Sequence, residues 1–355
     1  MPRLPLVVIA ALFSVQVFAA AVVESDVSAR AQGMAGAVAA DSDDIHAIFY
    51  NPAGLRFLSA PDNTIGQIAL HGAREGLPAE LSERDKPEIS GLIGGGGRGH
   101  FSFALGIYST GTTPLLSIND EAEKMSLDRM EWAAAGAWHN DWLSLGATLA
   151  VVDLSSADDD NIESSEYGLT LGALVSPINR YVDLFNSSFN YQLHLAAVGK
   201  TETEVKPFED LPRKQRSKMS VVARPQTLSL GVNQQIAWMT GFGAFSLGVN
   251  AELEQQKYSQ LNGYAIQSRS LDIQRQATSA ELKLAANGGP TLILRAGLAQ
   301  QQDDNKIWID QTRESVGLGV HGTQWGLDLA FSRIDSAREP GEERESFSAT
   351  ISSTW

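Results

Sequence analysis

The residue types that carry enzyme chemistry occur in this sequence, but they do not form a known catalytic pattern. The chain has no cysteine, which excludes thiolate chemistry and a disulfide framework. It also has no nucleophile elbow, no His-Glu-x-x-His pair and no Walker loop. The sequence therefore predicts no catalytic residue and no cofactor, and we do not expect an enzyme.

Two short runs nevertheless suggest a specific chemistry. The glycines at 94–97 resemble part of a phosphate loop, but no Lys-Ser/Thr pair follows them, and a strand that ends in a tight turn is the alternative. The aspartates at 158–160 suggest calcium binding, but they lack the glycine and the spaced glutamate of a known loop. A solvated loop is the alternative there, and we expect no metal site.

The clearest pattern is an alternation of apolar side chains with small, polar or charged ones. Leu145 and Leu149 share one face of the segment 142–153, whereas Ser144 and Thr148 share the other. This period of two is typical of a strand, because a helix repeats every 3.6 residues. About fourteen segments show it: 62–71, 88–97, 100–109, 129–139, 142–153, 165–175, 188–199, 225–237, 242–258, 278–286, 291–300, 313–322, 324–334 and 345–355.

Short and long connections alternate between these segments, as in an antiparallel transmembrane β-barrel with short turns at one end and long loops at the other. The connection 176–187 is the one exception among the short ones, and 200–224 and 259–277 are among the long ones. A β-sandwich would explain the period of two but not the alternation of connection lengths. The sequence thus predicts an all-β barrel of about 14 strands.

The polar face of each strand must then point into the lumen, because Arg or Lys on the lipid face costs about 2–4 kcal/mol near the middle of a bilayer. These side chains either pair with one another in a water-filled interior, as Glu281 could with Lys283 or Arg295, or form a ligand site. Counting by two predicts the following lumen-lining residues: His100, His194, Glu252, Glu281, Lys283, Arg295 and Asp328.

The ends of the chain fit an exported protein. Residues 4–21 form an apolar run after Arg3 and end in small residues, which predicts a signal peptide over 1–21, with a membrane anchor as the alternative. The last residues alternate outward and end on Trp355, similar to the signal that barrel-assembly machinery reads. The formal net charge of -15 argues against nucleic acid as a partner.

The segment 28–58 differs from the strands. It begins with closely spaced alanines and glycines, which allow close backbone packing. Asp41 or Ser42 is placed to cap a short helical run over 45–50. Asn51 is placed to cap a tight turn in which Pro52 is the first residue and Gly54 the last. On local physics alone, an ordinary helix followed by a loop is an equally good interpretation.

The letters ARAQGMAGAVAA at 29–40 and NPAGL at 51–55 resemble the N-terminal plug of FadL-type long-chain fatty acid transporters. These are outer-membrane barrels whose first segment folds back into the lumen. The segments 102–110, 133–149 and 224–232 also look like strands of that family. The resemblance implies a signal peptide at 1–21, a plug at 22–58 and a barrel at 59–355. It implies that the following residues set the conformation of the plug: Gly33, Gly36, Asp41, Asn51, Pro52, Ala53 and Gly54.

Two functions follow from this resemblance. The first is passive uptake of hydrophobic small molecules, such as long-chain fatty acids, through the outer membrane of a Gram-negative bacterium. The second is a docking barrel of a secretion or conjugation system, because PorV-like barrels share the N-terminal block. Expected partners are outer-membrane lipid and lipopolysaccharide, which the basic run at 213–218 would attract, a hydrophobic small-molecule ligand and the barrel-assembly machinery. We expect a monomer.

Overall fold

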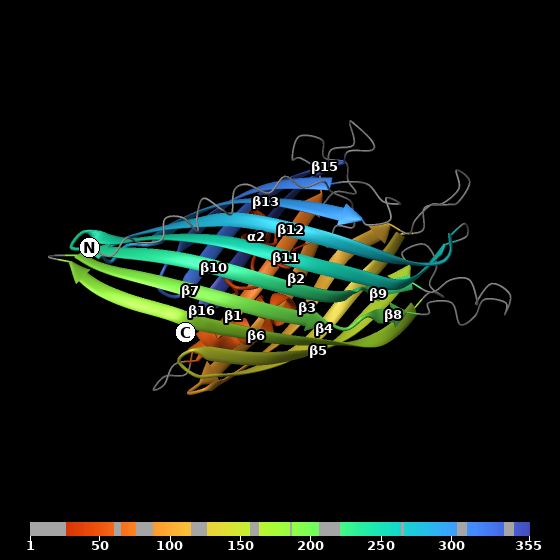
Figure 1. The fold of residues 1–355 in the computed structure, drawn as a ribbon, viewed down its shortest axis with the longest axis horizontal. Helices are drawn as coiled ribbons and strands as arrows, with labels where there is room; N and C mark the ends of the chain where they lie inside the picture. Colours follow the sequence, from red (N-terminus) through yellow and green to blue (C-terminus); the bar gives the residue numbers. More distant parts are fainter. Residues whose placement is uncertain are drawn as a thin grey trace.

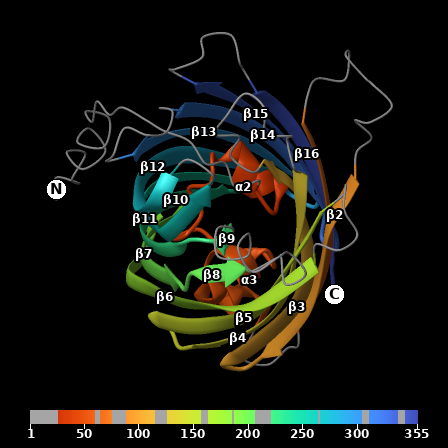
Figure 2. The same cartoon turned by 90° about the vertical axis from the view of Figure 1, so that its right-hand side faces the viewer.

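The computed structural model is a closed barrel of antiparallel strands with a folded segment inside it (Figures 1 and 2). It describes residues 26–59, 65–75, 88–114, 126–156, 163–184, 187–205, 221–263, 266–303, 311–336 and 344–355. The barrel strands are β1 (Ile65–Glu75), β2 (Glu88–Arg98), β3 (Phe101–Pro114), β4 (Ser126–His139), β5 (Leu143–Ser156), β6 (Glu163–Leu184), β7 (Ser187–Lys200), β10 (Gln226–Thr240), β11 (Gly243–Gly263), β12 (Ile266–Ala286), β13 (Thr291–Asp303), β14 (Gln311–His321), β15 (Trp325–Ser336) and β16 (Arg344–Thr354). The predicted barrel of about 14 strands is therefore confirmed.

Sequence neighbours pair around the barrel, and β1 pairs with β16 to close it, so that Gln67 lies opposite Thr354. The segment between β7 and β10 forms a separate two-stranded sheet, β8 (Thr203–Val205) with β9 (Val221–Arg224). Figure 2 shows this sheet inside the ring of strands. Arg224 is buried there, with a hydrogen bond to Thr170 of β6.

Among the described residues before the barrel there are three short helices: α2 (Ala29–Gly33), α3 (Ala47–Tyr50) and the 3-10 helix η1 (Pro52–Leu58). They lie within the ring of strands in Figure 2. None of the described helices has the length and apolar character needed to cross a membrane. We use the name plug for residues 26–59.

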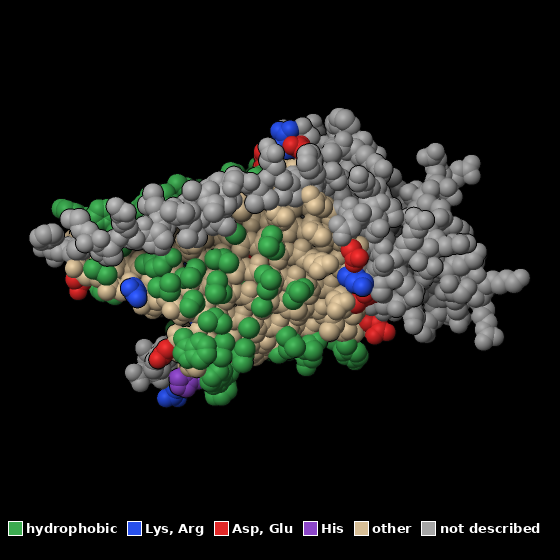
Figure 3. Space-filling model, viewed as in Figure 1, with side chains coloured by type: hydrophobic (Ala, Val, Ile, Leu, Met, Phe, Trp, Pro, Cys, Tyr) green, Lys and Arg blue, Asp and Glu red, His purple; other side chains and the backbone are tan. Residues whose placement is uncertain are grey.

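The strands carry their large apolar side chains on the outside. Leu149 is 67% exposed, whereas Ser144 and Thr148 on the other face of β5 are buried. The space-filling view shows hydrophobic side chains spread over this outer surface (Figure 3). The predicted alternation is thus observed, and its cause is physical: one face of each strand meets lipid and the other meets the lumen.

Two predicted connections are wrong in length. The connection predicted over 176–187 is mostly strand, because β6 continues to Leu184 and β7 begins at Ser187. The long connection predicted over 259–277 is also mostly strand, since β11 extends to Gly263 and β12 begins at Ile266. Backbone pairing continues in both hairpins after the apolar alternation has ended, and the sequence pattern reports only the alternation.

The β6–β7 extension gives the barrel an uneven rim at the end of the short turns. Figure 1 shows β6, β7 and β10 reaching further in this direction than the strands on the opposite side. Val182 pairs with Phe189, and the ring of Phe189 lies 6.2 Å from that of Trp238. Phe242, in the turn between β10 and β11, is 94% exposed.

Candidate functional site

The plug begins with a capped helix. Ser28 Oγ accepts a hydrogen bond from Ala31 N (3.1 Å), which caps α2. The chain then turns sharply at Gly36, whose φ of +76° suits glycine. Asn51 Oδ1 accepts from Ala53 N (3.1 Å), and Pro52 is the first residue of η1. The predicted Asn51 cap is observed, although the helix continues past Gly54 to Leu58.

The predicted cap by Asp41 or Ser42 is wrong. The helix begins at Ala47, and Asp44 Oδ1 accepts a hydrogen bond from His46 N (2.8 Å) just before it. Asp41 pairs instead with a buried arginine, and Ser42 Oγ donates to Val38 O (2.6 Å). No local pattern predicted the pairing of Asp41 with this arginine, because the arginine lies eleven positions upstream.

That arginine, Arg30, is the centre of the plug's electrostatics. Its guanidinium forms ion pairs with Asp41 (3.1 Å), Asp43 and Asp44 (3.5 Å) of the plug, and with Glu281 (3.2 Å) of β12. Its side chain is only 7% exposed. One buried cation therefore gathers three acidic side chains of the plug and fastens them to the wall.

Protonation in the plug follows from these contacts. Burial alone would raise the pKa of the Asp44 carboxyl, but His46 and Arg30 hold it well below its usual range. Burial raises the pKa of Asp41 to about 6, against the opposing effect of Arg30. The pKa shifts of the two carboxyls thus have opposite signs, so Asp41 favours the folded plug in acid and Asp44 favours it at higher pH.

The wall around Glu281 continues the network. Glu281 also pairs with Lys283 (2.9 Å) and Arg295 (2.6 Å), so the predicted self-pairing of these lumen residues is observed. Lys283 additionally contacts Asp43 of the plug (3.3 Å), and Arg295 continues to Asp328. The buried charges are compensated by one another, which an interior of low polarity requires.

Other wall residues bind the plug backbone directly. Glu252 of β11 accepts hydrogen bonds from Val38 N (3.0 Å) and Ala39 N (2.9 Å), and Arg275 of β12 donates to Ala35 O. Such contacts recognise the path of the backbone rather than its side chains. They place the loop between α2 and α3 against β11 and β12.

The opposite side of the plug is apolar. Ile45, Ile48, Leu55 and Leu58 are fully buried. They belong to a hydrophobic cluster completed mainly by small wall residues of β1–β5: Ala69, Ala104, Ala133, Ala135, Ala137 and Ala150, with Ile93 and Tyr108. Two wall hydroxyls donate hydrogen bonds to the plug backbone on this side, Thr148 Oγ1 to Ile48 O (2.8 Å) and Ser144 Oγ to Ala53 O (2.6 Å).

Close approach explains the predicted glycines and the Asn-Pro-Ala sequence. A Cβ on Gly33 would lie 3.0 Å from Gly317 Cα, and a Cβ on Gly54 would lie 2.2 Å from Ser42 O. Asn51 Nδ2 donates to Ala39 O (2.7 Å), which joins the two halves of the plug, and Ala53 is fully buried. All seven predicted plug residues therefore lie at packed positions.

Six of the seven predicted lumen residues face the interior: His194, Glu252, Glu281, Lys283, Arg295 and Asp328. His194 is half-buried, and its Nε2 lies 3.5 Å from Arg56 of the plug. The prediction for His100 is wrong. It lies in the turn before β3, exposed, with its Nδ1 on His139 O (2.9 Å). β3 begins at Phe101, so the alternation was extended one residue before the start of this strand.

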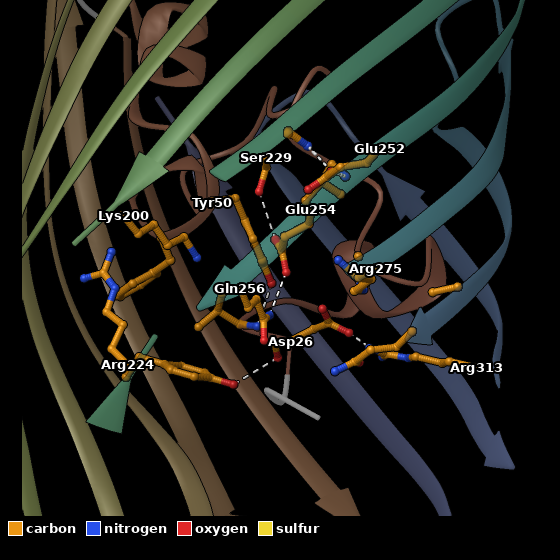
Figure 4. A pocket seen from close by; sticks show the side chains of 18 of the residues that line it. Asp26, Tyr50, Lys200, Arg224, Ser229, Glu252, Glu254, Gln256, Arg275 and Arg313 are labelled. Carbon is orange, nitrogen blue, oxygen red and sulfur yellow. Dashed lines mark hydrogen bonds and ion pairs between the residues drawn. The ribbon is translucent and has the colours of Figure 1, made fainter. Parts of the chain in front are cut away.

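The plug separates two cavities of the lumen. One, at the short-turn end, has a volume of about 260 Å³ and is lined by residues such as Asp43, Lys283 and His321. The other, at the end of the long connections, has a volume of about 110 Å³ and lies between the plug and a ring of charged wall residues (Figure 4). We call the second one the upper cavity.

Several residues of these sites were not predicted. Arg30 stands in the block that resembles the plug, but its partner Glu281 is 251 positions away, and no local pattern links them. Arg275 lies six positions before Glu281 on β12, so counting by two would have placed it in the lumen if the predicted strand had not begun at 278. Arg224 had no such signal, because it belongs to the inward-folded sheet rather than to the barrel.

Comparison with solved structures identifies the fold. The CymD monoaromatic hydrocarbon channel aligns with a TM-score of 0.53 at 12% identity, covering 94% of this chain and 98% of that one. The Pseudomonas putida toluene transporter TodX aligns with a TM-score of 0.51 at 12% identity, covering 94% and 99%. A FadL homologue of Pseudomonas aeruginosa gives 0.49 at 14% identity, covering 95% and 98%.

At the level of sequence, neither a protein-family model nor a curated protein matches. The structural likeness, at these identities, defines the fold: a FadL-type transmembrane barrel of 14 strands, as the N-terminal resemblance implied.

Proposed function

We propose that this protein is a passive channel that admits hydrophobic small molecules through the outer membrane of a Gram-negative bacterium. The observation that carries this proposal is the plug, which is buried within a barrel of the hydrocarbon-channel fold and has a cavity on either side. Displacement of the plug would join the two cavities. A ligand that binds the displaced state better would shift the population toward it.

The compounds carried by the structural neighbours indicate the class of substrate. CymD is described as a monoaromatic hydrocarbon channel and TodX as a toluene transporter. We therefore propose compact aromatic compounds beside the long-chain fatty acids that the resemblance implies. The volume of the upper cavity, about 110 Å³, favours the compact ones.

The expected setting follows from the ends of the barrel. Short turns would face the periplasm and long connections the outside, and the terminal strand presents Phe347, Ile351 and Trp355 outward for the assembly machinery and then for lipid. The basic run at 213–218, which would meet lipopolysaccharide, and the signal peptide at 1–21 lie outside the described residues. We propose a monomer, and the support for it is that the closed barrel leaves no open strand edge with which a second copy could pair.

Uptake into proteoliposomes tests the channel. Radiolabelled toluene and oleate are presented to vesicles that contain the protein, with protein-free vesicles as the background. Saturable uptake of either compound supports the proposal and selects the class. Uptake of both at the background rate would remove it.

A docking barrel is the second candidate, and one observation favours it. The β6–β7 hairpin extends beyond the strands on the opposite side at the short-turn end, and Phe242 is exposed in the turn between β10 and β11, so a partner protein could reach both. Shortening this hairpin by deletion of 179–188 distinguishes the two functions. A channel would transport substrate in both the wild type and the deletion variant. A docking barrel would transport none in either, and the deletion would abolish cross-linking to its partner.

A further inference from the structure

The upper cavity combines aromatic surfaces with charge. Phe49 and Tyr50 of the plug form part of its lining, and Tyr108 of β3 lies beside them with its ring 5.7 Å from that of Phe49. Tyr50 Oη accepts a hydrogen bond from Val27 N (2.6 Å), and burial raises the pKa of its phenol. The phenol therefore keeps its proton and remains a hydrogen-bond donor at the cavity surface.

Within the described residues, almost all of the charges around the cavity are compensated by direct contacts. The acidic side chains have basic, amide, hydroxyl or backbone donors, and the arginines have carboxylate or carbonyl acceptors. The contacts are Asp26 with Arg313, Glu131 with Arg129 (2.9 Å) and Arg224 (3.6 Å), Glu252 with Val38 N and Ala39 N, Glu254 with Ser229 (2.9 Å) and Gln256 (2.7 Å), and Arg275 with Ala35 O.

Lys200 is the exception. It is the last residue of β7 and lies opposite Thr170 and Thr227, both buried on the lumen face, so its side chain also points inward. Figure 4 shows it reaching toward Tyr50, with Arg224 on the same side of the cavity. Within the described part of the chain, no carboxylate oxygen lies within 4 Å of its ammonium group, although the residue is half-buried.

We propose that the upper cavity binds a single-ring aromatic carboxylate, with the ring against Phe49 and Tyr50 and the carboxylate on Lys200 Nζ. This inference rests on the proposed channel function and names its substrate class. Glu252 of the same cavity interacts with Lys200 only at longer range and accepts hydrogen bonds from the plug backbone. A half-buried cation with no carboxylate in direct contact attracts an anion more strongly than a solvated one, because the surroundings screen it less. The Tyr50 hydroxyl supplies a second donor to the same carboxylate.

Size and charge together select this ligand over two others. A cavity of roughly 150 Å³ holds benzene, so a volume of about 110 Å³ accommodates one ring after small side-chain adjustments and not an extended acyl chain. A neutral hydrocarbon such as toluene would fill the same space. It would also remove water from Lys200 without offering a partner, which is unfavourable for a charged group.

The test compares benzoate with toluene, which differ in the charged group on the same ring. Binding to the full-length protein in detergent is measured by calorimetry at low salt. We expect Lys200→Met to weaken benzoate binding roughly tenfold or more, the usual effect of losing a hydrogen bond to a charged group. Lys200→Arg should retain most of the benzoate affinity. Toluene binding should not weaken in any variant and should become tighter in Lys200→Met, because the desolvation cost of the ammonium group is then gone.

Lys257→Met is the matched control, because Lys257 lies on β11 with its side chain exposed, and does not line the cavity. It should leave benzoate binding unchanged. Equal loss in Lys257→Met, or full benzoate affinity in Lys200→Met, would overturn the role of Lys200. Binding of toluene without binding of benzoate would overturn the substrate class and leave the channel intact. Uptake of neither oleate nor toluene in proteoliposomes would remove the channel itself.

Discussion

The two sides of the plug meet the barrel through different chemistry. Toward β1–β5 the contact is apolar, with Ile48 and Leu55 packed on a wall of alanines. Toward β11–β16 the contact is ionic and hydrogen-bonded, with Arg30 on Glu281, Arg275 on Ala35 O and Gln32 on Ser332 (3.1 Å). Both interfaces are buried, so they differ in kind and not in exposure.

The two sides therefore contribute differently: one holds the plug in the lumen, and the other determines its position there. An apolar contact against small side chains gains free energy from buried area and depends little on direction. Charge pairs and backbone hydrogen bonds are directional, and each is costly to leave unmade once buried. We infer that the apolar side holds the plug in the lumen, while the ionic side specifies one position for it.

Removing the plug breaks both sides at once and should have the largest effect. Deletion of 28–49 should leave the strands paired, because a closed barrel satisfies its own backbone hydrogen bonds. Conductance in planar bilayers should rise from near zero to that of an open pore. An assembled deletion variant that stays as impermeable as the wild type would show that the segment does not seal the lumen.

Arg30→Met breaks the ionic side alone. Three plug carboxylates would lose their shared cation, and removal of one partner from a buried ion pair costs roughly 3–5 kcal/mol. The ratio of open to closed time in single-channel records should increase accordingly. Arg333→Met is the control, because Arg333 pairs with Asp335 at a well-exposed position, where a pair contributes about 1 kcal/mol or less.

Ile48→Ala weakens the apolar side alone. Truncation of a fully buried isoleucine should reduce the free energy that holds the plug in the lumen by roughly 2–4 kcal/mol. Because Arg30 still determines the position of the plug, the channel should open more often but return to the same closed conductance. Several different closed conductances in this variant would show that the ionic side alone does not determine the position of the plug. Leu149→Ala, on the lipid face, should change neither quantity.

The pH dependence of the ionic side is the smallest expected effect. The pKa of Asp41 is raised by burial from its usual 3.8 to about 6 in the seated plug. The stabilisation this gives is fully present below about 3.8 and is lost as the pH rises through about 6. Asp44 has a lowered pKa, so its contribution is present above about 3.8 and is lost only in stronger acid.

Between pH 7 and pH 5, acidification should therefore close the channel further, and Asp41→Asn should flatten this response. The measurement is the open fraction in single-channel records across that range. A wild-type channel that opens as the pH falls from 7 to 5 would show that another group dominates.

The sequence predicted the strands well, because lipid and lumen impose opposite demands on alternate residues such as Ser144 and Leu145. It predicted the Asn51 cap for an equally local reason. It missed the extended hairpins, since a strand outside lipid has no need of the apolar alternation. It also missed Arg30, because the pairing of Arg30 with Glu281 joins residues 251 positions apart and leaves no periodic trace.

The closure of β1 on β16 has a consequence for the order of assembly. The plug is translated before every strand, yet Arg30, Gln32 and Ala29 find their partners on β12, β15 and β16. These partners reach their positions only when the last strands are added. The plug is therefore made before the strands but completes its contacts after them, and until then its charged side chains must stay in water. A seated plug reports that the whole barrel has formed.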